Sequence, residues 1–235
     1  MNRTIVRLAA QALLGRRRGL LLLALPVVLI VLSIVIRALT EAGVGYEVVS
    51  TLGFGLALPL VALLSATAVL GPEIDDGSIV YLLAKPVNRY VIGLSKYVVA
   101  VAATLVFGAL PLLVAGLIVD SSDAGRAVAW LLGGTLAGTA YTALFLAVAA
   151  TTRHAVVAGL LFVLLWEGLM GGLLSGIRWL SIGAWGTELA SAASDAVAAP
   201  GTGLTYALAA AAVLVALGVW FTGDRLRSFS MRGET

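Results

Sequence analysis

The 235-residue sequence contains no cysteine, a single histidine and few charged residues. Without cysteine it has no disulfide framework, no thiolate metal site and no cysteine nucleophile. One histidine, His154, also excludes a metal centre built from several histidines. No G-x-x-x-x-G-K-[ST] loop is present, so no P-loop is available to bind a nucleotide. These absences predict a chain that is not itself an enzyme and that holds no cofactor or metal.

Charge is scarce throughout the chain. Charged residues make up 11% of it, against about 25% in ordinary soluble domains. Hydrophobic residues make up 61%, and the mean hydropathy is +1.07. We therefore expect an all-α membrane protein whose residues 1–235 form a single transmembrane domain. The basic pI, near 9.5, does not indicate nucleic-acid binding, because the basic residues lie at the ends of apolar runs, where they set topology.

The apolar runs predict six membrane-spanning helices. They cover residues 19–36, 48–70, 91–119, 127–150, 155–174 and 203–222. Pro26, Pro59 and Pro111 are expected to bend the first three. Before them, residues 2–15 have the pattern of an amphipathic helix lying in the membrane interface. The alternative for residues 2–15 is a basic leader that only orients the first span.

The distribution of basic residues predicts the orientation. With six spans, twelve of the fifteen Lys and Arg residues fall on one side of the membrane. This bias makes that side cytoplasmic, together with both termini and the polar segment 71–96. The twelve are Arg3, Arg7, Arg16, Arg17, Arg18, Lys85, Arg89, Lys96, Arg153, Arg225, Arg227 and Arg232.

Residues 175–202 then connect the last two spans on the extracytoplasmic side. Trp179 and Trp185, among several aliphatic residues, make this connection too apolar for a solvated loop. We predict a broken fifth span that re-enters the membrane or lies along its outer surface. The alternative is an ordinary outer loop with two interfacial tryptophans.

Two features of the fifth span invite a chemical interpretation. Ser175 and His154 do not form a protease pair, because they are expected at opposite ends of the span, beyond reach of proton transfer. Glu167 is the one acid inside an apolar run, and it is the candidate for the substrate path, as a polar lining or a partner for Arg178. The preferred alternative is a snorkelling acid or an inter-helix hydrogen bond.

The polar segment 71–96 contains a short helical pattern. Pro72 suits a helix start, and the acids Glu73, Asp75 and Asp76 would complement the positive helix N-terminus. After Gly77, Ile79, Leu82 and Leu83 share one apolar stripe, and Pro86 ends it. This stripe is expected to lie on lipid or to fill a groove on a partner.

The same segment contains a motif that reads E-x-x-x-G, then L-L-x-x-P-V-x-R, then a lysine. It is carried by Glu73, Gly77, Leu82, Leu83, Pro86, Val87, Arg89 and Lys96. This motif resembles that of the ABC type-2 permeases, a family that includes bacterial drug and antibiotic exporters. The six spans, the interfacial helix and the re-entrant segment agree with that family's architecture.

The resemblance implies a permease subunit in a bacterial inner membrane that pairs with a second permease subunit. Two separate ATPase subunits would bind ATP and magnesium and drive export. Their docking site would be a coupling helix within residues 71–96, formed by Glu73, Asp75, Asp76, Gly77, Leu82, Leu83, Pro86 and Arg89. The substrate cannot be deduced from the sequence. The alternatives are an ATP-independent secondary carrier and a membrane scaffold subunit that transports nothing.

Overall fold

A computed structural model describes residues 16–40, 42–75, 89–152, 154–170 and 176–231, and the regular elements in these ranges are all helical. The predicted all-α class is therefore confirmed for the described part of the chain. The predicted interfacial helix, residues 2–15, lies outside it. The helices are α2 (Arg16–Leu39), α3 (Ala42–Leu52), η1 (Gly53–Ala57), α4 (Leu58–Asp75), α6 (Arg89–Thr104), η2 (Leu105–Ala109), α7 (Leu110–Val119), α8 (Ala124–Ala149), α9 (Ala155–Leu161), η3 (Phe162–Met170), η4 (Ile177–Leu180), α11 (Ile182–Ala193) and α12 (Leu204–Met231).

Five helices are long and apolar enough to cross a membrane. They cover Gly19–Leu39, Val44–Leu70, Arg89–Val119, Ala124–Ala149 and Leu204–Arg227. Each matches one of the predicted spans to within a few residues at most ends. The connection after the first span is shorter than the interval 37–47 between the first two predicted spans, because α2 ends at Leu39 and α3 begins at Ala42.

The remaining predicted span, residues 155–174, corresponds to α9 and η3. Its apolar helix is shorter than the other five. At 1.5 Å per residue, a helix over 155–170 is about 24 Å long, less than the roughly 30 Å of a bilayer core. Residues 171–175 lie outside the described ranges, so a complete sixth crossing stays a prediction.

Of the three prolines that were expected to bend the first three spans, two follow a wide helical turn. In η1 the Leu58 N–H bonds the Gly53 carbonyl, and in η2 the Leu110 N–H bonds the Leu105 carbonyl, each five residues back. Pro59 and Pro111 come directly after these turns. A proline has no N–H for the carbonyl four residues back and its ring crowds that carbonyl, so a wide turn just before it relieves both problems. Pro26, by contrast, lies inside the regular α-helix α2.

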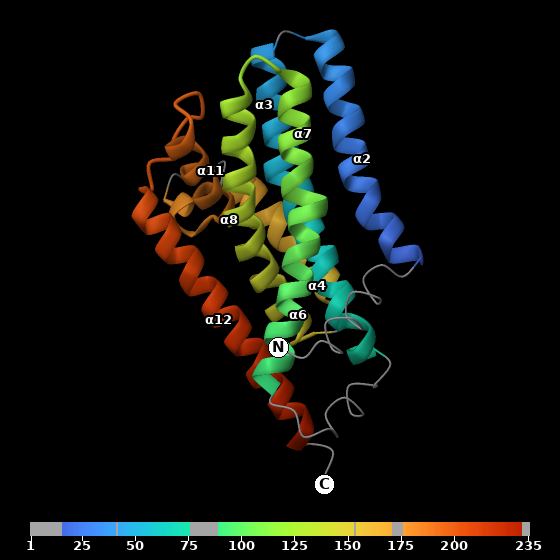
Figure 1. The fold of residues 1–235 in the computed structure, drawn as a ribbon. Helices are drawn as coiled ribbons and strands as arrows, with labels where there is room; N and C mark the ends of the chain where they lie inside the picture. The colour runs from blue at the N-terminus through green and yellow to red at the C-terminus, as the bar shows by residue number, and fades with distance from the viewer. Residues whose placement is uncertain (1–15, 41, 76–88, 153, 171–175, 232–235) are drawn as a thin grey trace.

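The helix α8 is the centre of the bundle and contacts α4, α6, α7, α9, α11 and α12 (Figure 1). Its buried positions are mostly alanine and glycine, which let neighbouring helices approach closely. Gly134 and Gly138 face other helices: a Cβ on Gly134 would lie 2.9 Å from Leu112, and one on Gly138 would lie 3.1 Å from Thr104. The large apolar side chains of the core gather around this helix.

Two helices are only lightly buried. α2 stands along one side of the bundle and α12 runs obliquely along another (Figure 1). Only 28% and 17% of their most apolar windows are buried within the chain. Their exposed apolar side chains, such as Leu20, Val213 and Trp220, therefore face lipid or another protein subunit.

Arg37 joins the end of α2 to the end of α7. Its Nη1 donates to the Ile118 carbonyl at 2.6 Å and to the Val119 carbonyl at 3.3 Å. A cation at a helix C-terminus satisfies carbonyls that have no intrahelical partner and interacts favourably with the helix dipole.

We expect Arg37→Gln to lower the free energy of unfolding by about 1 kcal/mol, measured by denaturation in mixed micelles. Arg37→Lys should lose less, and equal losses in the two variants would contradict the proposed contact.

Candidate functional site

The predicted coupling residues fall at the boundary of the described structure. Asp76, Gly77, Leu82, Leu83 and Pro86 lie outside the described ranges. Glu73 and Asp75 belong to the last turns of α4, and Arg89 is the first residue of α6. The two helices that flank residues 76–88 therefore place both ends of the predicted coupling segment at one end of the bundle, the lower end in Figure 1. We call this the basic end, because Arg89 begins α6 there and Arg225 and Arg227 lie near the end of α12.

One part of the prediction for this segment is wrong. Pro72 does not begin a new helix, because α4 continues without a break from Leu58 to Asp75. Glu73 and Asp75 consequently lie near a helix C-terminus, and not near the positive N-terminus that they were expected to complement. A proline inside a helix removes one backbone hydrogen bond, and the apolar second span continues as a helix through Pro72 despite that cost.

Lys96 connects the two flanking helices. This residue of α6 is only 1% exposed, and its Nζ donates to the Val69 carbonyl of α4 at 2.8 Å. Val69 lies in the second half of α4, before its last turn. A buried lysine bonded to the neighbouring helix holds α4 and α6 in a fixed relative position just inside the predicted coupling segment.

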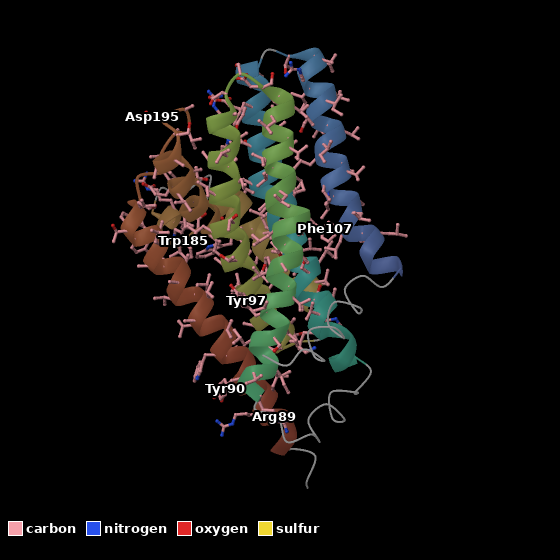
Figure 2. The ribbon with its side chains drawn as sticks, in the orientation of Figure 1. Arg89, Tyr90, Tyr97, Phe107, Trp185 and Asp195 are labelled. Carbon is pink, nitrogen blue, oxygen red and sulfur yellow. The ribbon has the colours of Figure 1, made fainter. Side chains whose placement is uncertain are left out.

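The beginning of α6 is also fixed to the end of α12. A Cβ on Gly223 would lie 2.5 Å from the Tyr90 ring, and one on Gly93 would lie 3.5 Å from the Gly223 nitrogen. Tyr90 and Arg227 form a side-chain hydrogen bond. Figure 2 shows Arg89 and Tyr90 together at the basic end, with Tyr97 higher along α6. The segment 76–88 thus emerges from helices that are packed on one another.

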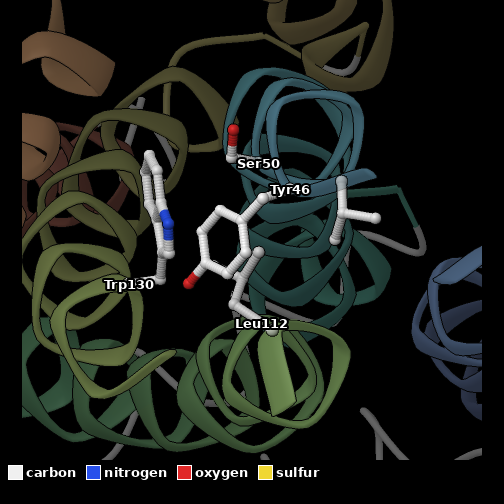
Figure 3. Close-up of a pocket in the computed structure, with 6 residues that line it drawn as sticks. Tyr46, Ser50, Leu112 and Trp130 are labelled. Carbon is white, nitrogen blue, oxygen red and sulfur yellow. The ribbon is translucent and has the colours of Figure 1, made fainter. Parts of the chain in front are cut away.

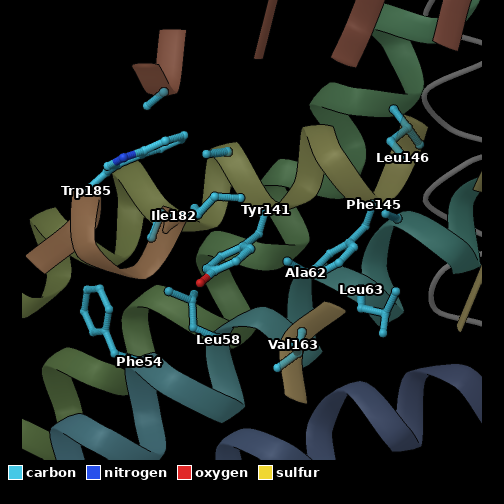
Figure 4. Packing of buried hydrophobic residues seen from close by; sticks show 14 of the residues in the cluster. Phe54, Leu58, Ala62, Leu63, Tyr141, Phe145, Leu146, Val163, Ile182 and Trp185 are labelled. Carbon is cyan, nitrogen blue, oxygen red and sulfur yellow. The ribbon is translucent and has the colours of Figure 1, made fainter. Parts of the chain in front are cut away.

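Glu167 lies in an inter-helix hydrogen-bond network. Its Oε2 accepts a hydrogen bond from the Ser181 hydroxyl at 2.6 Å, and its Oε1 accepts one from the Ile182 N–H at 2.8 Å. The Tyr141 hydroxyl of α8 is a further partner. Ser181 is the N-cap of α11, so Glu167 joins η3, α8 and the start of α11. In Figure 4, Tyr141 and Ile182 lie side by side among buried side chains.

This geometry agrees with the preferred interpretation of Glu167 as an inter-helix hydrogen bond. A carboxylate at the N-terminus of α11 accepts from backbone and hydroxyl donors that would otherwise be unpaired. The pairing with Arg178, considered as one functional interpretation, is not observed among the described contacts, where the Arg178 Nη1 donates to the Pro200 carbonyl at 3.0 Å. Glu167 fixes the position of α11, and the observed contacts assign it no substrate.

α11 begins beside the middle part of α8, well away from either end of the bundle. Its first turn is beside Tyr141, roughly two-thirds of the way along α8, and its last residues pack near Ala129, close to the beginning of α8. Gly186 of α11 meets Gly133 of α8 so closely that a Cβ on Gly133 would lie 2.3 Å from the Gly186 carbonyl oxygen. Trp185 is buried and Trp179 is exposed. Residues 182–193 are thus a partly buried helix that packs against α8 and α12, while their re-entry into the membrane stays a prediction.

A second buried acid was missed by the sequence analysis. Glu188 of α11 is 8% exposed, and its Oε2 accepts hydrogen bonds from the Gly201 N–H and from the Thr202 N–H and hydroxyl. The neighbouring Gly201 and Gly203 have φ angles of +79° and +83°, which favour glycine. The G-T-G sequence before the last span was the available signal for this turn, which leads into α12.

The threonines of the central spans do not form a polar pathway through the described bundle. Thr104 and Thr142 are buried and lie 2.9 Å apart, oxygen to oxygen, between α6 and α8. Thr135 and Thr139 donate to carbonyls of their own helix. These hydroxyls bond backbone carbonyls of their own helix or a hydroxyl of the neighbouring helix, as in other membrane bundles.

His154 is an exposed residue at the N-cap of α9, in agreement with the predicted role at a helix end, whereas Ser175 lies outside the described ranges. Among the described residues, no group of three or more His, Cys, Asp or Glu side chains is arranged to hold a metal ion. The sequence matches no protein-family model and no curated protein sequence. The function must therefore be argued from the geometry and from the sequence motif.

Proposed function

We propose that this chain is the membrane subunit of an ABC exporter of the type-2 permease class, driven by separate ATPase subunits that dock on residues 71–96. The proposal rests on the contacts that connect α4 and α6, the two helices that flank this segment, to each other and to α12. Lys96 fixes α6 to α4, and Tyr90 and Gly223 pack α6 on α12. A force applied to residues 76–88 by a partner would be passed to three helices together.

The charge distribution supports a cytoplasmic position for this docking segment. Arg89 begins α6, and Arg225 and Arg227 lie in the last two turns of α12. These helix ends lie at the basic end (Figure 1), and the positive-inside rule predicts a cytoplasmic surface for such a group of basic residues. A bacterial inner membrane, with both termini in the cytoplasm, follows from the same proposal. ATP is available to a partner only on that side.

The exposed apolar faces of α2 and α12 support pairing with a second permease subunit. A substrate path between two such subunits would not need a polar channel within one chain. ATP-driven transport would require two arrangements of the bundle with different affinities for the substrate. In this proposal, the joined ends of α4, α6 and α12 move as one unit between those arrangements.

The test is co-purification of ATPase subunits with the tagged full-length chain from native membranes in mild detergent. Leu82→Asp combined with Leu83→Asp places two charges in the proposed docking stripe, and we expect the nucleotide-binding partner and its ATPase activity to be lost. The matched control, Ser121→Asp with Ser122→Asp, adds two charges to the turn at the opposite end and should retain the partner. Both variants should insert into the membrane normally.

Two results would overturn the proposal. Full retention of the ATPase by the Leu82/Leu83 variant would remove the coupling role of the segment. A wild-type chain that purifies without any nucleotide-binding partner would favour an ATP-independent carrier or a scaffold subunit. Substrate movement without ATP would then favour the carrier, and the absence of any movement would favour the scaffold subunit.

A further inference from the structure

The short helical turn η4 carries basic and aromatic side chains on the surface of the bundle. Arg178 is exposed, and the next two residues, Trp179 and Leu180, are 41% and 59% exposed. Tyr206, at the start of α12, is also exposed and packs edge-on against Trp179, with the ring centroids 4.9 Å apart. We call Arg178, Trp179, Leu180 and Tyr206 the η4 surface.

Contacts with η3 and α8 place η4 well inside the length of the bundle. The Trp166 Nε1 of η3 donates to the Leu180 carbonyl at 3.3 Å. Just after η4, a Cβ on Gly183 would lie 3.3 Å from the Tyr141 hydroxyl of α8. At 1.5 Å per residue, Tyr141 is about 26 Å from the start of α8 and about 12 Å from its end. Because α8 is long and apolar enough to cross a membrane, we expect η4 within the depth of the bilayer.

The backbone of η4 is anchored by aromatic donors. The Trp179 carbonyl accepts hydrogen bonds from the Trp185 Nε1 of α11 and from the Tyr206 hydroxyl of α12, each at 2.9 Å. With the bond from Trp166 to Leu180, side chains of three different helices hold this turn. Carbonyls at membrane depth must find donors within the protein, and these do. The η4 surface is therefore preformed, with its own side chains left facing outward.

Arg178 is the charged member of the η4 surface. Its Nη1 donates to the Pro200 carbonyl at 3.0 Å, which leaves further N–H groups of the guanidinium for a ligand. No ion pair among the described residues includes Arg178. Gly201, next to Pro200, bonds Glu188 in the second half of α11, so the guanidinium is directed away from the basic end. Long basic side chains at membrane depth extend in this way toward lipid headgroups.

We propose that the η4 surface binds a phospholipid of the leaflet opposite the basic end, which we call the outer leaflet. Arg178 binds the headgroup phosphate, whose oxygens match the paired N–H groups of a guanidinium. The Trp179–Tyr206 pair lies against the glycerol region, since both residue types favour the membrane interface. Exposed Leu204 and Leu208 of α12 continue the apolar surface for an acyl chain. The inference needs only a chain that spans a membrane and does not rest on an ATPase partner.

The first test measures contact between Trp179 and lipid. The full-length chain is reconstituted in phosphatidylcholine vesicles whose acyl chains carry bromine, which quenches nearby tryptophan fluorescence. The difference between the wild type and Trp179→Phe isolates the emission of Trp179, and we expect brominated lipid to quench it and aqueous iodide to leave it unchanged. The anchoring bonds of η4 use the Trp179 backbone carbonyl, so this variant keeps them.

Trp130→Phe is the matched control for the quenching experiment. Figure 3 shows Trp130 inside the bundle, beside Tyr46 and Leu112. Its ring also packs edge-on against Phe54, with the centroids 4.6 Å apart. The difference between the wild type and Trp130→Phe should therefore respond much less to brominated lipid than the difference for Trp179.

The second test measures the phosphate contact. Brominated phosphatidylglycerol is titrated into the full-length chain in mixed micelles, and the quenching gives a dissociation constant. Arg178→Gln should bind about fivefold more weakly, whereas Arg178→Lys, which keeps the charge, should stay within about twofold of the wild type. A brominated digalactosyl diacylglycerol has no phosphate and should bind the wild type and Arg178→Gln equally. Arg126→Gln removes a cation outside the η4 surface and should keep the wild-type affinity.

Several results would overturn the inference. Quenching of Trp179 by iodide alone would place η4 in water, as in an ordinary outer loop. Quenching by neither reagent would mean that protein, such as a second copy of the chain, covers the η4 surface. Equal affinities in the wild type and Arg178→Gln, or an equal loss in Arg126→Gln, would remove the specific phosphate contact. Displacement of the lipid by inorganic phosphate would assign Arg178 to a free anion. None of these results bears on ATPase docking, which the Leu82/Leu83 experiment tests separately.

Discussion

Glu167→Ala is expected to lower the free energy of unfolding by on the order of 3 kcal/mol. The substitution removes the acceptor for the Ser181 hydroxyl and the Ile182 N–H, and one partner of the Tyr141 hydroxyl. These groups lie between helices, where an unpaired donor is expensive and hydrogen bonds to a charged group are stronger than average. Denaturation in mixed micelles, followed by circular dichroism, measures the loss.

Two matched variants separate the network from simple volume loss. Ser181→Ala removes one donor to the carboxylate and the cap acceptor of the Ala184 N–H but leaves the carboxylate bonded to Ile182, so we expect a loss of about 2 kcal/mol. Glu167→Gln keeps the shape and one oxygen acceptor, and it should fall between Ser181→Ala and Glu167→Ala. If Glu167→Gln were as stable as the wild type, the charge at the start of α11 would have no structural role.

Gly133→Ala is the second substitution with a large expected effect. The added Cβ would lie 2.3 Å from the Gly186 carbonyl oxygen and 3.0 Å from both the Ala190 Cβ and the Phe54 ring. A backbone carbonyl cannot rotate away as a side chain can, so α11 must move off α8. We expect a loss of about 3 kcal/mol, at the upper end for overpacked sites, in the same denaturation experiment.

The control for this substitution is Gly55→Ala. Gly55 also lies in a helical segment, and nothing lies within 4 Å of a Cβ added there. Because alanine is favoured over glycine in helices, Gly55→Ala should leave stability unchanged or raise it by up to about 1 kcal/mol. Similar losses at positions 133 and 55 would mean that the close approach of α8 and α11 does not govern stability.

The periodicity and length of the apolar runs were sufficient to predict the spans. A helix that crosses a membrane must satisfy its own backbone, so composition alone reveals it. The five confirmed helices agree with this reasoning. The prediction at Pro72 was wrong because a local helix-start signal competes poorly with an apolar helix that is already formed. Residues 76–88 carry most of the motif and lie outside the described ranges, so the coupling site itself remains a prediction.

The sequence by itself determined that this protein is a helical membrane protein, roughly where its spans lie and which end is basic, because these properties depend on residues close together in the chain. Only the tertiary structure decided which polar groups meet. Glu167 pairs with Ser181, fourteen positions later, and Lys96 with Val69, twenty-seven positions earlier. Tyr46 and Trp130 share a cavity wall although more than eighty residues separate them. Such contacts depend on how the helices pack around α8, and no local pattern in the chain encodes that packing.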